Sequence, residues 1–95
     1  PTCIICSNNI MVKGSLKAIQ EKGLSIPEDI SICCFGNIET NEYSLTDITN
    51  IQQDTRLMGR KAGELLLSQI NEENHCSVKI KLSGKMIERS SVRQI

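Results

Sequence analysis

The chain has 95 residues, of which 39% are hydrophobic and 23% are charged, and its eleven basic side chains balance its eleven acidic ones. This neutral charge argues against a nucleic-acid or anionic-membrane surface on the chain, and no apolar run reaches the roughly 18 residues of a spanning helix. Phe35 and Tyr43 are too few aromatic residues for a platform on which bases stack. We therefore expect one small domain or a piece of one.

The N-terminal part of the chain predicts a buried strand followed by a helix. The continuous apolar run of residues 2–7 is typical of a parallel strand that is covered on both faces. Residues 7–9 are suitable N-cap types, and Gly23 is placed to end the helix in the left-handed conformation. The apolar positions at helical spacing are Val12, Leu16 and Ile19.

A second buried strand is predicted over residues 30–35. Because strand, helix and strand follow one another within so few residues, the two strands should run parallel and be joined by a right-handed crossover. The Gly36-Asn37 pair ends the strand, and the aperiodic residues 38–47 predict an exposed loop. A short strand over residues 48–52 is expected next.

The remaining residues predict a second helix and terminal strands. Asp54 is a suitable N-cap for the helix, which should end at the polar residues 71–74. Apolar residues alternate with lysines over residues 78–82, which predicts a half-exposed strand, and Gly84 should turn the chain into a last strand from Met86. The whole pattern predicts an α/β fold with a mainly parallel sheet. The apolar side of the second helix consists of Leu57, Met58, Ala62, Leu65, Leu66 and Ile70.

The five cysteines suggest a redox or metal site, but their positions argue against one. Cys3 and Cys6 form a C-x-x-C pair, yet residues three apart on a strand point to opposite faces, so their sulfurs cannot meet. The same alternation separates Cys33 from Cys34. We expect free cysteines that pack as small hydrophobic side chains.

Residues for catalysis are also missing from the sequence. The one histidine, His75, lies in a polar stretch beside Cys76, without the spacing of a zinc site and without a partner nucleophile. Ser83-Gly84-Lys85 looks like the end of a phosphate loop, but the upstream glycine is missing. We predict that the chain is not an enzyme and holds no metal and no cofactor.

Several short motifs follow one another in a specific order. They are Ser7-Asn8-Asn9 after the first strand, KGLSIPEDIS over residues 22–31, Phe35-Gly36-Asn37, TNIQQD over residues 49–54, and Glu88-Arg89-Ser90-Ser91. Their order and spacing resemble the LacI/GalR family of bacterial transcription regulators over essentially the whole chain. The related periplasmic sugar-binding proteins are the group most easily confused with it.

The resemblance implies the C-terminal part of a two-lobed effector-binding domain with the periplasmic-binding-protein-like type I fold. Residues 1–51 would belong to the C-terminal lobe, 52–54 to a hinge, 55–88 to the N-terminal lobe, and 89–95 to the C-terminal lobe again. A helix-turn-helix that binds operator DNA would lie in a part absent from this chain. Pro1, which is not an initiator residue, fits a fragment of a longer polypeptide.

The function implied by the resemblance is that of a repressor domain which senses a small, sugar-like molecule. The alternative is a periplasmic sugar-binding receptor of an ABC transporter. Unpaired cysteines favour a reducing compartment, and therefore a cytoplasmic protein, over the periplasm. No membrane partner is expected.

The candidate ligand site lies at the carboxyl ends of the parallel strands, where ligands of such sheets bind. The resemblance implies that a ligand contacts Asn8, Asn9, Asn37 and Gln53. At the positions of Asn9 and Gly36, members of the family that bind sugars have aspartates, which this chain lacks. The alternative role is helix capping for Asn8 and Asn9, and a turn for Asn37.

The resemblance also implies a homodimer that packs through the C-terminal lobe. Its contacts would include Met11, Lys13, Tyr43 and Leu45, although the last two could instead pack against their own lobe. A basic series near the C-terminus could suggest DNA, but its alternation with apolar neighbours predicts a solvated face. The series is Lys79, Lys81, Lys85, Arg89 and Arg93.

Overall fold

The structure, a computed structural model, describes residues 1–38, 47–71 and 77–94. The chain divides into two compact units. The first unit comprises Pro1–Gln52 and Lys85–Ile95, and the second comprises Gln53–Gly84. None of the helices in the described ranges has the length and apolar character that crossing a membrane requires.

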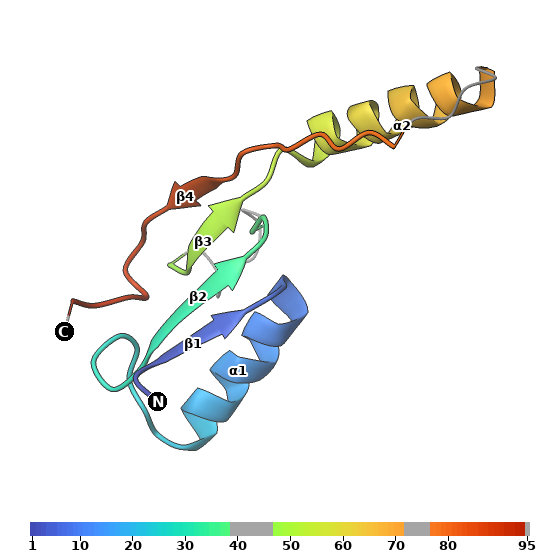
Figure 1. The fold of residues 1–95 in the computed structure, drawn as a ribbon. Coiled ribbons are helices and arrows are strands. Elements are labelled where there is room, and N and C mark those ends of the chain that lie inside the picture. The colour runs from blue at the N-terminus through green and yellow to red at the C-terminus, as the bar shows by residue number, and fades with distance from the viewer. Residues whose placement is uncertain (39–46, 72–76, 95) are drawn as a thin grey trace. The chain divides into compact units, whose positions relative to one another are not determined.

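The first unit contains a four-stranded sheet in which the strands lie in the order β1-β2-β3-β4 (Figure 1). β1 pairs parallel with β2, β2 pairs parallel with β3, and β4 runs antiparallel to β3. This arrangement confirms the predicted α/β fold with its βαβ unit. The strands are β1 (Cys3–Cys6), β2 (Ser31–Phe35), β3 (Thr49–Gln52) and β4 (Lys85–Ile87).

Helix α1 (Asn9–Glu21) begins and ends where its capping residues predict. The Asn8 side chain is the N-cap: its Oδ1 accepts a hydrogen bond from the Met11 backbone N–H at 2.9 Å. At the other end, Gly23 has a φ of 68°, and the Leu24 N–H donates to the Ile19 carbonyl at 3.1 Å. This hydrogen bond and the left-handed glycine form a Schellman motif, so the predicted stop signal is confirmed.

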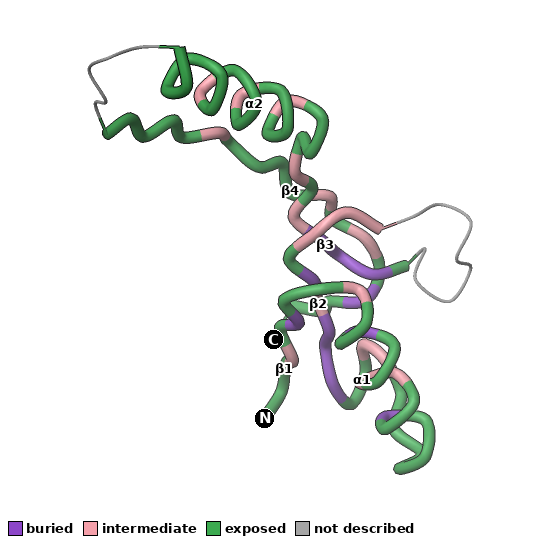
Figure 2. Tube along the Cα trace, turned by 90° about the vertical axis from the view of Figure 1, so that its right-hand side faces the viewer, coloured by how far each residue is buried: buried purple, intermediate pink, exposed green. Residues whose placement is uncertain are grey.

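The core of the first unit lies between α1 and one face of the sheet. Side chains that alternate along β1 and β2 meet the inner side of α1, and Val12 and Ile32 are both 0% exposed. Figure 2 shows the buried segments in this unit. Burial of each such side chain contributes about 2 kcal/mol of hydrophobic stabilisation. The core residues are Cys6, Val12, Ile19, Ile30, Ile32, Cys34 and Ile48.

Hydrogen bonds of Ser91, which is 2% exposed, anchor the segment after β4 to the middle of the sheet. Its hydroxyl oxygen accepts a hydrogen bond from the Thr49 N–H at 2.8 Å and donates one to the Ile32 carbonyl. Its own backbone N–H donates to the Asp47 carbonyl at 3.0 Å. One serine therefore supplies partners to backbone groups at β2, at β3 and just before β3.

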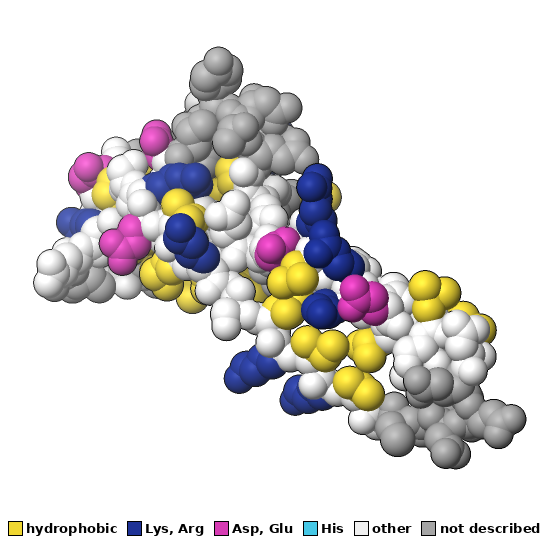
Figure 3. Space-filling view, turned by 90° about the horizontal axis from the view of Figure 1, so that it is seen from above, with side chains coloured by type: hydrophobic (Ala, Val, Ile, Leu, Met, Phe, Trp, Pro, Cys, Tyr) yellow, Lys and Arg dark blue, Asp and Glu magenta, His cyan; other side chains and the backbone are white. Residues whose placement is uncertain are grey.

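The second unit contains helix α2 (Thr55–Asn71), which the predicted N-cap starts. Asp54 Oδ1 accepts a hydrogen bond from the Leu57 N–H at 3.0 Å. None of the residues of α2 is buried. Figure 3 shows apolar side chains at the surface among lysines and arginines. The exposed large apolar residues of this unit are Met58, Leu66, Leu67, Ile70, Val78 and Ile80.

The predicted strand over residues 78–82 is wrong. Residues 77–84 form neither helix nor strand. A strand requires a neighbour that satisfies its backbone N–H and C=O groups, and none of the described strands pairs with these residues. Alternation of apolar and polar residues was therefore not sufficient to make a strand here.

Candidate functional site

Three of the four amide residues predicted to bind a ligand lie at the carboxyl ends of β1 and β2. Asn8 and Asn9 follow β1 directly at the start of α1, and Asn37 follows β2. The Asn9 Nδ2 donates a hydrogen bond to the Asn37 carbonyl at 2.7 Å, and its Oδ1 accepts one from the Cys34 thiol at 3.7 Å. The topology of the βαβ unit thus places the ends of two strands side by side, as expected for a parallel sheet.

The turn after β2 is formed by Gly36 and Asn37. Gly36 has a φ of 139°, a conformation that residues with a Cβ rarely adopt. Its N–H donates to the Ile51 carbonyl in β3 at 3.0 Å. An aspartate, as expected at this position in sugar-binding members of the family, would be strained in this conformation. The backbone conformation at Gly36 therefore favours glycine at this position.

Two residues behind this turn were not predicted as part of the site. Asn50 is 3% exposed, and its Nδ2 donates to the Gly36 carbonyl at 2.9 Å. The Arg89 Nη1 donates to Asn50 Oδ1 at 2.9 Å and to the Ile48 carbonyl at 3.2 Å. The available signal was an amide at the centre of a predicted strand, since a strand amide that becomes buried requires partners.

The interpretation of the basic series as a solvated face is wrong for Arg89. This residue is half-buried and binds β3 through its side chain and its backbone, because β4 delivers it to the edge of that strand. The other four residues of the series are exposed, as predicted: Lys79, Lys81, Lys85 and Arg93.

The described residues at this edge are neutral. Residues 7–9 and 35–38 contain no aspartate or glutamate. The cap of α1 uses the Oδ1 of the exposed Asn8, and a side-chain amide also carries two N–H donors. Phe35, which is 46% exposed, adds an apolar ring beside the turn. Such an edge suits hydrogen bonding to an uncharged polar molecule better than binding of a cation.

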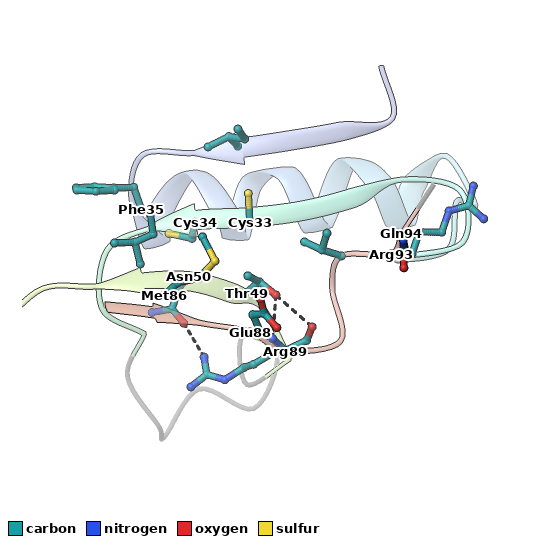
Figure 4. Close-up of a pocket in the computed structure, with 13 residues that line it drawn as sticks. Cys33, Cys34, Phe35, Thr49, Asn50, Met86, Glu88, Arg89, Arg93 and Gln94 are labelled. Carbon is teal, nitrogen blue, oxygen red and sulfur yellow. Dashed lines mark hydrogen bonds between the residues drawn. The ribbon is translucent and has the colours of Figure 1, made fainter. Parts of the chain in front are cut away.

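A separate hollow of about 650 Å³ lies on the sheet of the first unit (Figure 4). The apolar residues that line it alternate with those that face α1, which places it mainly on the opposite face of the sheet. None of the predicted ligand residues lines it. Because sheets with parallel strands are normally covered on both faces, we assign the hollow to an uncovered core face rather than to the ligand site. Its apolar lining includes Ile5, Cys33, Phe35, Ile51, Met86 and Val92.

The other predicted site residues are distributed differently. Gln53 is half-buried and belongs to the second unit. Met11 and Lys13 are exposed on α1, and the Ser7 hydroxyl donates to the Met11 sulfur at 2.9 Å. Tyr43 and Leu45, the remaining predicted dimer contacts, lie outside the described residues.

The four cysteines of the sheet are free. Cys3 is exposed while Cys6 is buried opposite Cys34, which agrees with the predicted alternation. Burial raises the pKa of Cys33 and of Cys34 above the ordinary value of 9.0, and the neighbouring thiols of Cys3 and Cys6, respectively, raise it further. Such thiols remain protonated at neutral pH and act as apolar side chains. Among the described residues, no group of three or more ligating side chains could hold a metal.

Comparison with known proteins identifies the domain. Residues 1–92 match the family of periplasmic binding protein-like domains. Over all 95 residues the chain is 37% identical to the HTH-type transcriptional repressor PurR of Vibrio atlanticus (strain LGP32). It spans 28% of the length of that relative.

Solved structures show the same fold. The structure matches a putative transcriptional regulator LacI from Bacillus cereus subsp. cytotoxis with a TM-score of 0.87 at 22% identity, over 98% of this chain and 33% of that one. It matches the Lac repressor dimer bound to operator and the anti-inducer ONPF with a TM-score of 0.79 at 28% identity, over 97% and 32%. The chain therefore belongs to the periplasmic binding protein-like family, and its relatives support a fragment of an effector-binding domain of the LacI/GalR type.

Proposed function

We propose that the chain is the effector-binding and dimerising part of a bacterial LacI-type transcriptional repressor. The observation that carries the proposal is the cluster of Asn8, Asn9 and Asn37 where β1 and β2 end, held by the 2.7 Å hydrogen bond from Asn9 to Asn37. This edge is where parallel α/β sheets bind ligands. The relative that the chain matches is named as a transcriptional repressor, which supports the same conclusion.

The proposed effector is a small, uncharged polar molecule, such as a sugar or a molecule with similar hydrogen-bonding groups. Asn8, Asn9, Asn37 and Gln53 are the proposed contacts, because amides can both donate to and accept from hydroxyl or amide groups. The neutral edge favours this class over a charged ligand. We propose no catalytic role and no cofactor for the domain.

The division into lobes follows from the same proposal. Residues 1–51 and 89–95 would form part of the C-terminal lobe, residues 52–54 a hinge, and residues 55–88 part of the N-terminal lobe. The exposed apolar side chains of α2 and the uncovered sheet face would then pack against the rest of the effector-binding domain. The chain spans just over a quarter of its PurR relative, 28%, which leaves ample sequence for such partners.

The proposed assembly is a cytoplasmic homodimer. Met11 and Lys13 on α1, together with Tyr43 and Leu45, would contribute to its interface. Operator DNA would be bound by a helix-turn-helix domain outside this chain, which agrees with the neutral charge of the 95 residues. A periplasmic receptor is not favoured, because the four described cysteines are free.

Thermal unfolding of the full-length regulator with a panel of neutral sugars and nucleobases tests the proposal. A compound that binds only the folded state raises the melting temperature. Calorimetry should then show that Asn8→Asp and Asn37→Ala each weaken binding of that compound about tenfold, the size expected for one lost hydrogen bond. Asn8→Asp keeps the oxygen that caps α1, removes the amide donor and adds a negative charge to the neutral edge.

Gln20→Ala is the matched control, since Gln20 is an exposed amide residue near the other end of α1. Its affinity should equal that of the wild type. The proposed contacts are refuted if Asn8→Asp and Asn37→Ala both bind as the wild type does. The effector class is refuted if no compound of the panel raises the melting temperature.

A further inference from the structure

We propose that Asn50 is a positioning residue of the candidate ligand site, which holds the Gly36-Asn37 turn in the conformation that presents Asn37. The inference rests on the proposed function, since it concerns the support of the same site. The argument begins with the burial of Asn50, which is 3% exposed in the middle strand pair of the first unit. A buried amide is stable only when its polar atoms have partners.

Both ends of the Asn50 side chain are paired. Its Nδ2 donates to the Gly36 carbonyl at 2.9 Å, and its Oδ1 accepts from the Arg89 Nη1 at 2.9 Å. The amide is therefore oriented: only one assignment of its oxygen and nitrogen suits a carbonyl on one side and a guanidinium on the other. An apolar residue could occupy this position of the strand, but it has no N–H group to donate to the Gly36 carbonyl.

The two residues of the turn are held from β3 and from α1. Gly36 donates its N–H to the Ile51 carbonyl at 3.0 Å and accepts from Asn50, so both of its backbone polar groups are bound to β3. The next carbonyl, that of Asn37, accepts from the Asn9 Nδ2. A turn with three such bonds is preorganised, and a ligand that contacts Asn37 does not have to order it.

Arg89 extends this network to the C-terminal segment. Besides Asn50 it binds the Ile48 carbonyl, and its backbone N–H donates to Thr49 Oγ1 at 3.0 Å. Figure 4 shows the hydrogen bonds of Arg89 with Asn50 and with Thr49 as dashed lines. The hydrogen-bonded series Arg89, Asn50 and Gly36 is continuous, and each bond orients the donor of the next.

Two variants each remove one of the two side-chain hydrogen bonds of Asn50. Asn50→Asp keeps an oxygen for Arg89, now as an ion pair, but places a second oxygen opposite the Gly36 carbonyl, so that the bond to the turn is replaced by repulsion. Arg89→Met removes the guanidinium and leaves the bond from Asn50 to Gly36. Asn50→Thr is a further variant that suits a strand and is too short to reach the turn.

Amide hydrogen exchange of the full-length protein without effector is the direct measurement, with the α1 amide of Ile19 as reference. In Asn50→Asp and in Asn50→Thr the turn loses the hydrogen bond to the Gly36 carbonyl. The Gly36 N–H, which is bound to the Ile51 carbonyl, should therefore open more often and exchange about tenfold faster than in the wild type, with the reference unchanged. In Arg89→Met its rate should change by less than about threefold. Wild-type exchange at Gly36 in both Asn50 variants overturns the proposal, as does equal acceleration of Gly36 and Ile19, which would indicate general destabilisation.

The measurement separates this inference from the proposed function because it needs no effector. Faster exchange at Gly36, with no compound of the sugar and nucleobase panel stabilising the full-length regulator, refutes the proposed effector class and leaves the positioning of the turn supported. If a panel compound binds, Asn50→Asp should weaken it about tenfold and Arg89→Met by less than about threefold. Equal weakening by the two variants overturns the positioning role.

Discussion

Helices α1 and α2 have similar apolar patterns but different surroundings. Both begin at a capped residue, Asn8 for α1 and Asp54 for α2. In α1 the apolar positions Val12 and Ile19 are buried against the sheet, whereas α2 has no buried residue. The comparison shows that capping and periodicity are sufficient to define a helix, while burial of its apolar side depends on a neighbour that another part of the chain must supply.

The same contrast divides the two units. Every buried residue of the described chain belongs to the first unit, where a sheet and a helix cover each other. The second unit exposes leucines and isoleucines, such as Leu66 at 60% and Ile70 at 68%. An apolar stripe of this kind is typical of a surface that binds another protein segment. The predictions below test this difference, beginning with the largest effect.

Truncation of one apolar residue in each unit, buried in the first and exposed in the second, should give the largest contrast. Ile32→Ala should lower the free energy of unfolding by about 3 kcal/mol, because it opens a cavity in a fully buried site. Leu66→Ala should change it by less than about 0.5 kcal/mol. Urea unfolding followed by circular dichroism measures both. An equal loss in the two variants would show that the apolar side of α2 is covered in solution.

Removal of the Ser91 hydroxyl should have the next largest effect. Ser91→Ala leaves the buried Thr49 N–H and the Ile32 carbonyl without this partner, which should lower the free energy of unfolding by about 2 kcal/mol. The exposed neighbour provides the control, and Ser90→Ala should stay within about 0.5 kcal/mol of the wild type. A mild effect of Ser91→Ala in urea unfolding would show that water replaces the hydroxyl.

Removal of the two N-cap side chains should be detected by different measurements. Asn8→Ala removes the acceptor for the Met11 N–H and should lower the stability of the first unit by about 1 kcal/mol. Asp54→Ala should reduce the helical circular dichroism of α2 and leave the unfolding midpoint of the first unit unchanged. A shift of that midpoint by Asp54→Ala would mean that the two units unfold together.

Alkaline pH should have the smallest effect, and only on the first unit. The pKa of Cys33 and of Cys34 is higher in the folded state than the ordinary 9.0. Their contribution to stability is therefore complete below pH 9.0 and is lost as the pH rises through the raised pKa values. The urea midpoint should fall above pH 9.0 in the wild type and fall less in a Cys33→Ala, Cys34→Ala variant. Equal slopes would exclude these thiols as the cause.

Much of the fold and part of the site could be predicted because the signals are local. The caps at Asn8 and Asp54 act within one helical turn, and Gly23 acts within its own turn. The strand alternation that separates Cys3 from Cys6 is likewise a property of consecutive residues. That Asn8, Asn9 and Asn37 lie at one edge could be predicted because the carboxyl ends of parallel strands meet wherever a βαβ unit forms. Their proposed contact with a ligand came from the resemblance to the family.

The order and limits of the main elements, the parallel pairing and the edge where polar residues gather could thus be predicted from the sequence. Three features depend on long-range contacts: residues 78–82 form no strand, Arg89 binds Asn50 of β3, and Asn50 donates to the Gly36 carbonyl after β2. The reason is physical: capping and periodicity depend on residues a few positions apart. A hydrogen bond between Asn50 and Arg89, 39 positions apart, exists only once β4 lies beside β3.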